Sequence, residues 1–125
     1  MTPLLFVAVA ASGGLGAAFR LFLDGVIRSR SRGPVPWGTI TINLTGSLAL
    51  GLITGLTASQ AIPAPLHAVV GAGFLGGYTT FSTASFETIR LLQERKRVTT
   101  ALVSFGTLLG AAALAGLGLW IGGLW

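Results

Sequence analysis

The sequence predicts an all-α membrane protein with four transmembrane helices, the third of which is broken near its middle. Hydrophobic residues make up 52% of the 125-residue chain and charged residues only 9%, and the mean hydropathy is +0.82. Soluble domains carry about 25% charged residues, so this composition indicates a membrane protein. The apolar residues fall into four segments, each with at least the roughly 20 residues that cross a bilayer.

Short connections join the predicted helices into a single domain over residues 1–125. The four helices cover about residues 3–27, 37–58, 65–92 and 98–124. Tryptophan anchors membrane helices at the headgroup level, and the segment ends carry Trp37, Trp120 and Trp125. The first segment has no Lys or Arg before Arg20, so it lacks the basic start of a signal peptide.

Basic residues are concentrated at two of the three connections. The seven residues that flank the predicted helices there are Arg28, Arg30, Arg32, Arg90, Arg95, Lys96 and Arg97. The N-terminus, the second connection and the C-terminus contain no Lys or Arg. The positive-inside rule therefore predicts that both basic loops are cytoplasmic and that both termini lie outside. Topology and lipid headgroups explain the net charge of +5, so we expect no nucleic-acid partner.

The stretch from Gly71 to Glu87 is typical of a transmembrane helix with an interruption. Gly76 and Gly77 each weaken a helix by about 1 kcal/mol, and a dense run of Thr and Ser residues begins at Thr79. Non-helical backbone survives at membrane depth only where it is buried in protein or lines a water-filled cavity. The break therefore predicts an ion or solute site. The alternative is a kink relieved by Ser and Thr hydrogen bonds to the helix backbone.

Polar residues also recur at helical spacing in the second and fourth segments. They are Thr39, Asn43, Ser47 and Thr54 on the second and Thr100, Ser104 and Thr107 on the fourth. These faces line one narrow polar track, or they make interhelical hydrogen bonds worth about 0.6–2 kcal/mol each. The glycine-xxx-glycine faces Gly51–Gly55, Gly73–Gly77 and Gly106–Gly110 indicate close helix packing, and on so small a protein such small-residue surfaces suggest dimerisation.

The charged residues in the segments leave alternatives open. Arg20 extends its charge to the interface or attracts anions into a vestibule, and Asp24, one turn away, is placed to pair with it. Glu87 is a vestibule charge or the partner of Arg90. His67 is typical of an interfacial residue, because no acidic or cysteine ligand lies near it in the sequence. The sequence contains no nucleophile–base pair, P-loop or paired intramembrane carboxylates, so we expect no enzymatic activity.

These motifs resemble the Fluc/CrcB family of bacterial fluoride channels over essentially the whole chain. Residues Gly13–Arg20, GGLGAAFR, are similar to the family's glycine-rich first-helix pattern that ends in arginine. Residues Thr39–Gly46 resemble its second-helix asparagine motif. Residues Gly73–Thr83, GFLGGYTTFST, closely match the GFxGGxTTFST signature of its third helix.

The resemblance implies an antiparallel dimer with two fluoride pores and a structural Na+ at its centre. The carbonyls that hold this Na+ correspond to Gly76 and Thr79, so two copies of the chain supply four oxygens, which suit a hard cation. The pore asparagine, phenylalanine, serine and threonine fall within the second and third segments, and the polar face of the fourth segment extends this track. The expected pore residues are Asn43, Phe81, Ser82, Thr83, Ser104 and Thr107, with Arg20 and Glu87 in a vestibule.

The resemblance further implies a passive channel that lets fluoride leave the cytoplasm and so lowers its concentration in the cell. One position departs from the family, because its second phenylalanine falls at Ala84. The one-sided loop charge argues against insertion in both orientations. We therefore hypothesise that this subunit pairs with an inverted, related subunit and that one of the two pores is degraded. A homodimer of this chain is the alternative.

Two other functions fit a chain of this size. A small four-helix multidrug exporter that exchanges protons for cationic drugs has a similar length, but it needs a membrane-embedded carboxylate. The first segment has none before Arg20, and Asp24 lies at its end. A structural membrane subunit that conducts nothing is the second alternative. Loss of fluoride flux on replacing Asn43 and Phe81, with the dimer intact, separates a channel from this structural role.

Overall fold

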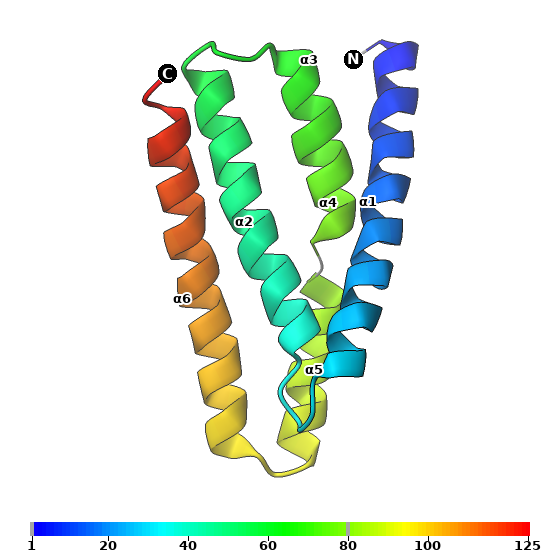
Figure 1. The fold of residues 1–125 in the computed structure, drawn as a ribbon, viewed down its shortest axis with the longest axis vertical. Helices are drawn as coiled ribbons and strands as arrows, with labels where there is room; N and C mark the ends of the chain where they lie inside the picture. The colour runs from blue at the N-terminus through cyan, green and yellow to red at the C-terminus, as the bar shows by residue number, and fades with distance from the viewer. Residues whose placement is uncertain (1, 80) are drawn as a thin grey trace.

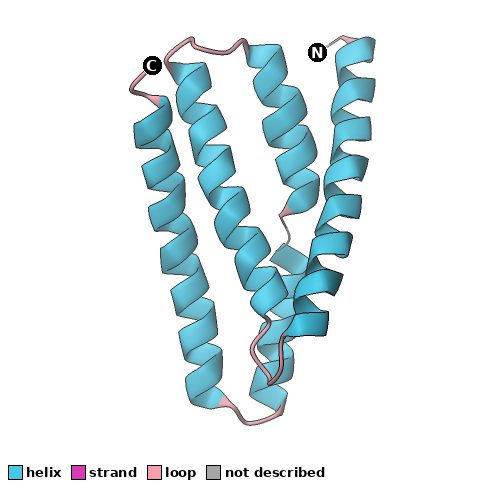
Figure 2. Ribbon diagram, viewed as in Figure 1, coloured by secondary structure: helices cyan, strands magenta, loops and turns pink. Residues whose placement is uncertain are grey.

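The computed structural model describes residues 2–79 and 81–125, except for the side chains of Phe81, Ser82, Thr83 and Phe86. Every regular element in these ranges is a helix (Figure 1, Figure 2). In chain order they are α1 (Pro3–Arg30), α2 (Trp37–Ala58), α3 (Ala64–His67), the π-helix η1 (Ala68–Leu75), α4 (Gly76–Tyr78), α5 (Phe81–Gln93) and α6 (Arg97–Gly122).

Three of these helices, α1, α2 and α6, are each long and apolar enough to cross a membrane. The predicted class of an all-helical protein with membrane-spanning segments is therefore confirmed. The third predicted span is divided among several shorter elements. The first three of them, α3, η1 and α4, follow one another without a gap from Ala64 to Tyr78, and α5 begins at Phe81 (Figure 1).

The interruption of this third span occurs at Thr79. Its backbone is extended, with φ −79° and ψ 156°. The Thr79 N–H donates to the Leu75 carbonyl at 2.9 Å, and the Thr79 hydroxyl donates to the same carbonyl at 3.0 Å. Both donors thus complete the last helical turn before the chain leaves the helix. The predicted interruption is confirmed.

The glycine pair does not itself break the helix, because Gly76 and Gly77 both belong to α4. Gly77 lies against α1, where a Cβ atom at this position would collide with the Gly13 carbonyl. Small residues allow membrane helices to approach at such distances. Gly77 therefore serves the packing of α4 on α1, and the weak intrinsic helix propensity of glycine is outweighed there.

The other close helix contact is between α2 and α6. A Cβ on Gly51 of α2 would collide with the Ala115 carbonyl, and one on Gly118 of α6 would collide with the Leu48 carbonyl. Helix association in lipid depends on this kind of van der Waals contact, because lipid tails are as apolar as leucine. Gly106 has no described atom within 4 Å of where its Cβ would be, so this face of α6 has no described neighbour.

The α1–α2 and α5–α6 connections lie at one end of the molecule, and both termini lie at the other (Figure 1). We call the first of these the basic end, because every Lys and Arg except Arg20 is found there. The first helix continues to Arg30, about one turn past its predicted end, so Arg28 and Arg30 occupy its last turn. Cations in this position stabilise the negative end of the helix dipole by about 0.3–1 kcal/mol each.

Candidate functional site

Helices α2, α5 and α6 border a groove of about 670 Å³. We call it the three-helix groove. Its polar side chains are hydroxyls and one amide, and none of its described lining residues is charged. These polar residues are Thr39, Asn43, Ser47, Thr79, Ser85, Thr88, Ser104 and Thr107. Apolar residues such as Leu50 and Val103 make up much of the remaining wall.

Several of these hydroxyls already donate their only proton within the chain. Thr79 donates to the Leu75 carbonyl and Thr88 to the Ala84 carbonyl, at 3.0 and 2.8 Å. Thr39 donates to the Glu87 carboxylate at 2.8 Å. In contrast, the buried Ser104 hydroxyl has no hydrogen-bond partner among the described residues. The groove therefore contains a hydroxyl whose proton is available to a ligand.

The structure brings together five of the seven residues predicted from helical spacing, because all but Thr54 and Thr100 line the three-helix groove, namely Thr39, Asn43, Ser47, Ser104 and Thr107. Two members of the same polar faces lie elsewhere. Thr54 contacts His67, with 3.2 Å between the hydroxyl and Nε2, and Thr100 donates to the Lys96 carbonyl of its own helix at 2.7 Å.

The predicted pore side chains of Phe81, Ser82 and Thr83 lie outside the described residues. Of the two residues expected to hold Na+, Thr79 lines the groove and Gly76 is exposed next to the break. No described atom comes closer than 3.9 Å to the position of a Cβ on Gly76. The surface beside Gly76 is therefore open to a partner. A single chain contributes only two of the carbonyls, so these residues fit a hard cation only when a second chain supplies the rest.

Arg20 and Asp24 do not pair with each other, contrary to expectation. The Nε of Arg20 donates to the Gly77 carbonyl at 3.3 Å, beside the helix break. Asp24 instead accepts from Nε of Arg28 at 2.8 Å. The spacing of four residues between Asp24 and Arg28 is typical of helical ion pairs, so the sequence contained a signal from which this contact could have been predicted.

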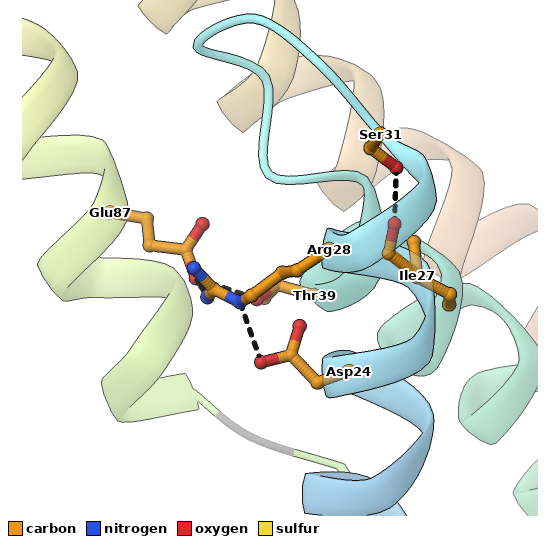
Figure 3. Close-up of polar contacts among 6 residues, drawn as sticks. All are labelled: Asp24, Ile27, Arg28, Ser31, Thr39 and Glu87. Atoms are coloured by element: carbon orange, nitrogen blue, oxygen red, sulfur yellow. Dashed lines mark hydrogen bonds and ion pairs between the residues drawn. The ribbon is translucent and has the colours of Figure 1, made fainter.

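Glu87 pairs with Arg28 and not with Arg90, so that predicted partner is wrong. Its carboxylate is only 2% exposed, and one of its oxygens accepts from both Arg28 and Thr39 at 2.8 Å. Figure 3 shows Arg28 extending from α1 toward Glu87 on α5, with Asp24 one turn away. These contacts join α1, α2 and α5 at the basic end, across 48 and 59 residues of sequence.

Tyr78, the last residue of α4, is a structural contributor that sequence reasoning missed. It is buried, and its hydroxyl lies 2.9 Å from the Thr45 hydroxyl on α2. Thr45 donates to the Thr41 carbonyl, so Tyr78 is the donor to Thr45. The Tyr78 ring also packs near those of Phe19 and Phe74. Tyr78 therefore fixes the helix end at the break against both α1 and α2.

A sequence profile for the family described as CrcB-like protein, Camphor Resistance (CrcB), matches residues 7–119. This chain belongs to the CrcB family. Its relatives include Fluoride-specific ion channel FluC 1 of Leifsonia xyli, which is 53% identical over 99% of this chain and 90% of its own length. Fluoride-specific ion channel FluC 2 of Cutibacterium acnes is 47% identical over 91% and 94%. The FluC 2 protein of Mycobacterium tuberculosis H37Rv is 38% identical over 97% and 93%.

The family membership predicted from the motifs is therefore confirmed, over nearly the full length of the chain. Within the CrcB fold of this protein, Ala84 lines the three-helix groove at the position where the motif comparison expected a second phenylalanine. A methyl group in place of a ring leaves that part of the groove wider.

Proposed function

We propose that this chain is a subunit of a passive fluoride-selective channel that lets fluoride leave the cytoplasm. The observation that carries the proposal is the three-helix groove, which offers hydroxyl and amide groups but no charged side chain among its described residues. Donors of this kind replace the water around a small anion, and the lack of a full positive charge keeps the anion from being trapped. The names of the relatives, fluoride-specific ion channels, support the same function.

A second subunit is needed to narrow the groove. Its volume of about 670 Å³ is far larger than the roughly 30 Å³ occupied by one water molecule. A small anion in so wide a space would keep its hydration shell and contact few protein donors at once. An inverted partner across the open side would close the groove into a narrow pore, and a four-span subunit in an antiparallel dimer is the assembly we propose.

The same assembly supports a structural Na+ at the centre of the dimer. The carbonyls of Gly76 and Thr79 lie on either side of the end of α4, and Gly76 faces open space. Two chains would bring four carbonyl oxygens together, and a hard cation prefers such ligands. The ion would therefore join the two helix breaks, with no side-chain ligand required.

The partner we favour is an inverted, related subunit. Seven of the eight basic residues, all but Arg20, lie at the basic end, and none flanks the helices at the opposite end, which favours one orientation with the basic end in the cytoplasm. We expect a reporter fused to the C-terminus to be found almost entirely outside. Equal populations inside and outside would favour a homodimer that inserts both ways.

Efflux from liposomes that contain this chain, reconstituted alone and together with an inverted relative, tests the channel. We expect fluoride efflux to exceed chloride efflux when a potassium ionophore balances the charge. Ser104→Ala removes the available hydroxyl from the groove, and we expect fluoride flux to fall by about tenfold, the effect of one hydrogen bond to an anion. Thr100→Val, one turn away on α6, removes a hydroxyl outside the groove and serves as the matched control.

Two results would refute this function. Equal fluoride flux in the Ser104→Ala and Thr100→Val variants would remove the groove from the conduction path. No fluoride flux from a chain shown by cross-linking to be dimeric, alone and after co-reconstitution with an inverted relative, would favour the non-conducting subunit. Efflux of a cationic dye driven by a proton gradient would favour the multidrug exporter.

A further inference from the structure

A second cavity lies at the basic end and differs in character from the three-helix groove. It measures about 240 Å³, several times the roughly 30 Å³ of a water molecule. The α1–α2 connection covers it, with the end of α1 and part of α5 forming its walls, and it shares only Pro36 with the groove. Two arginines and one carboxylate line it, namely Arg28, Arg90 and Glu87.

The two guanidinium groups have hydrogen-bond donors to spare. The Nε atom of Arg90 is buried and has no partner among the described residues. Arg28 uses Nε on Asp24 and Nη2 on Glu87, whereas a guanidinium carries five N–H donors. Two arginines that face one cavity suit a phosphate group, which accepts such donors in pairs.

One of the lining residues, Glu87, also has a buried acceptor that lacks a donor. Glu87 is 2% exposed, and its second oxygen has no hydrogen-bond partner among the described residues. In Figure 3 this oxygen points away from the Arg28 guanidinium. The negative charge of a phosphate ligand that has no hydrogen-bond donor would be repelled by this carboxylate oxygen. A ligand that carries a hydroxyl beside the phosphate would satisfy the arginines and the carboxylate together.

The position of the cavity corresponds to the lipid headgroup region. Trp37 lines the cavity and is 50% exposed, and tryptophan in membrane proteins is enriched at the level of the headgroups. The surrounding basic residues of both connections attract anionic lipids to this end of the protein. A ligand that combines phosphate and hydroxyl is therefore present at this depth in any membrane that contains phosphatidylglycerol.

We propose that this cavity binds a phosphodiester anion that carries a neighbouring hydroxyl, as in the headgroup of phosphatidylglycerol. Arg28 and Arg90 bind the phosphate, and the second oxygen of Glu87 accepts a hydrogen bond from the hydroxyl. A soluble glycerophosphodiester has the same chemistry. The site goes beyond channel function and does not depend on it, because the ligand needs neither ion conduction nor a dimer in order to bind.

Native mass spectrometry of the purified, delipidated full chain tests the ligand. Phosphatidylmethanol is the matched ligand, because it has the same phosphodiester charge and no hydroxyl. We expect phosphatidylglycerol to bind about tenfold more tightly than phosphatidylmethanol, the effect of one hydrogen bond to a carboxylate. Free glycerophosphoglycerol added as competitor identifies the source: displacement only at great excess assigns the site to lipid, and displacement at equal concentration assigns it to a soluble ligand.

Matched arginine variants test the cavity itself. We expect Arg90→Gln to weaken phosphatidylglycerol binding by about tenfold or more. Arg95→Gln, which removes an exposed arginine of the same end outside the cavity, should change it by less than about twofold. Arg90→Lys keeps the charge without the planar fork and should give an intermediate loss. Circular dichroism verifies that each variant is folded.

Glu87→Gln tests the acceptor. We expect this variant to keep binding both lipids but to lose most of the preference for phosphatidylglycerol over phosphatidylmethanol. Equal affinity of the unaltered chain for the two lipids would overturn the role of Glu87 and with it the proposal. Equal losses for Arg90→Gln and Arg95→Gln would also overturn it, since diffuse attraction to the basic end would then explain the binding.

Discussion

The contact between α2 and α6 offers a direct test of how this fold is held together. Gly118→Ala places a methyl group against the Leu48 carbonyl and 2.6 Å from the Leu52 nitrogen. Both are backbone atoms inside a helix, so neither can yield by changing a rotamer. The two helices must separate, and we expect a loss of about 1–3 kcal/mol in the free energy of unfolding, the usual cost of overpacking.

Gly116→Ala is the matched control, because it makes the same substitution two residues away on α6. Gly116 is exposed, and no described atom lies within 4 Å of where its Cβ would be. Alanine favours helix over glycine, so we expect the stability of this variant to stay the same or rise by up to about 1 kcal/mol. Reversible unfolding in mixed micelles, followed by circular dichroism, measures both. A Gly118→Ala protein as stable as Gly116→Ala would refute the close contact.

Two further substitutions test the contacts that join the other helices. Arg28→Gln leaves the buried Glu87 carboxylate with one donor fewer, and we expect a loss of about 1–2 kcal/mol, at the low end for a buried pair because the Arg28 side chain is half exposed. A double-mutant cycle with Glu87→Gln should show a smaller loss for the pair than the sum, and strict additivity would contradict the contact. Tyr78→Phe removes the hydrogen bond to Thr45, and we expect a loss of about 1 kcal/mol in the same unfolding assay. Thr45→Val added to Tyr78→Phe should then cost little more, and a second full loss would show that the two hydroxyls act separately.

The long helices could be predicted from the sequence because apolar length alone determines them in lipid. The starts of α1 and α2 at Pro3 and Trp37 agree with the expected segments. The end of α1 was less predictable. Arginines mark loops in a hydropathy plot, yet Arg28 and Arg30 lie in the last helical turn, where the helix dipole favours them.

The helix break was predictable from the sequence, but the residue at which the backbone leaves the helix was not. The glycine pair and the run of Thr and Ser residues from Thr79 together predicted the interruption, and the weakest helix formers in it are Gly76 and Gly77. Packing of Gly77 on α1 keeps them helical, and the chain leaves the helix at Thr79, where both of its donors are satisfied within the preceding turn. Propensity is a local quantity, whereas the contact with α1 joins residues about sixty positions apart.

Spacing likewise predicted only part of the candidate site. Ser104 and Thr100 are one turn apart on the same face, but Ser104 lines the groove and Thr100 donates to its own helix. The helical period predicts which residues share a face of a helix, but it does not predict which part of that face borders a groove. The partner of Glu87 was also out of reach, because Arg28 on α1 is as far from it in sequence as many residues that it never contacts.

The directions in which the hydroxyls along the groove donate their hydrogen bonds determine which of them can donate to an anion. Many hydroxyl residues line the three-helix groove, but the hydroxyls of Thr79 and Thr88 already donate hydrogen bonds to backbone carbonyls. The Thr39 hydroxyl donates a hydrogen bond to the Glu87 carboxylate, which also forms an ion pair with Arg28. An anion in the groove would therefore face the oxygen lone pairs of these three hydroxyls. It would accept hydrogen bonds from other hydroxyls, such as that of Ser104. The ion pair at the basic end thus affects the groove without facing it, because it determines the direction in which Thr39 donates.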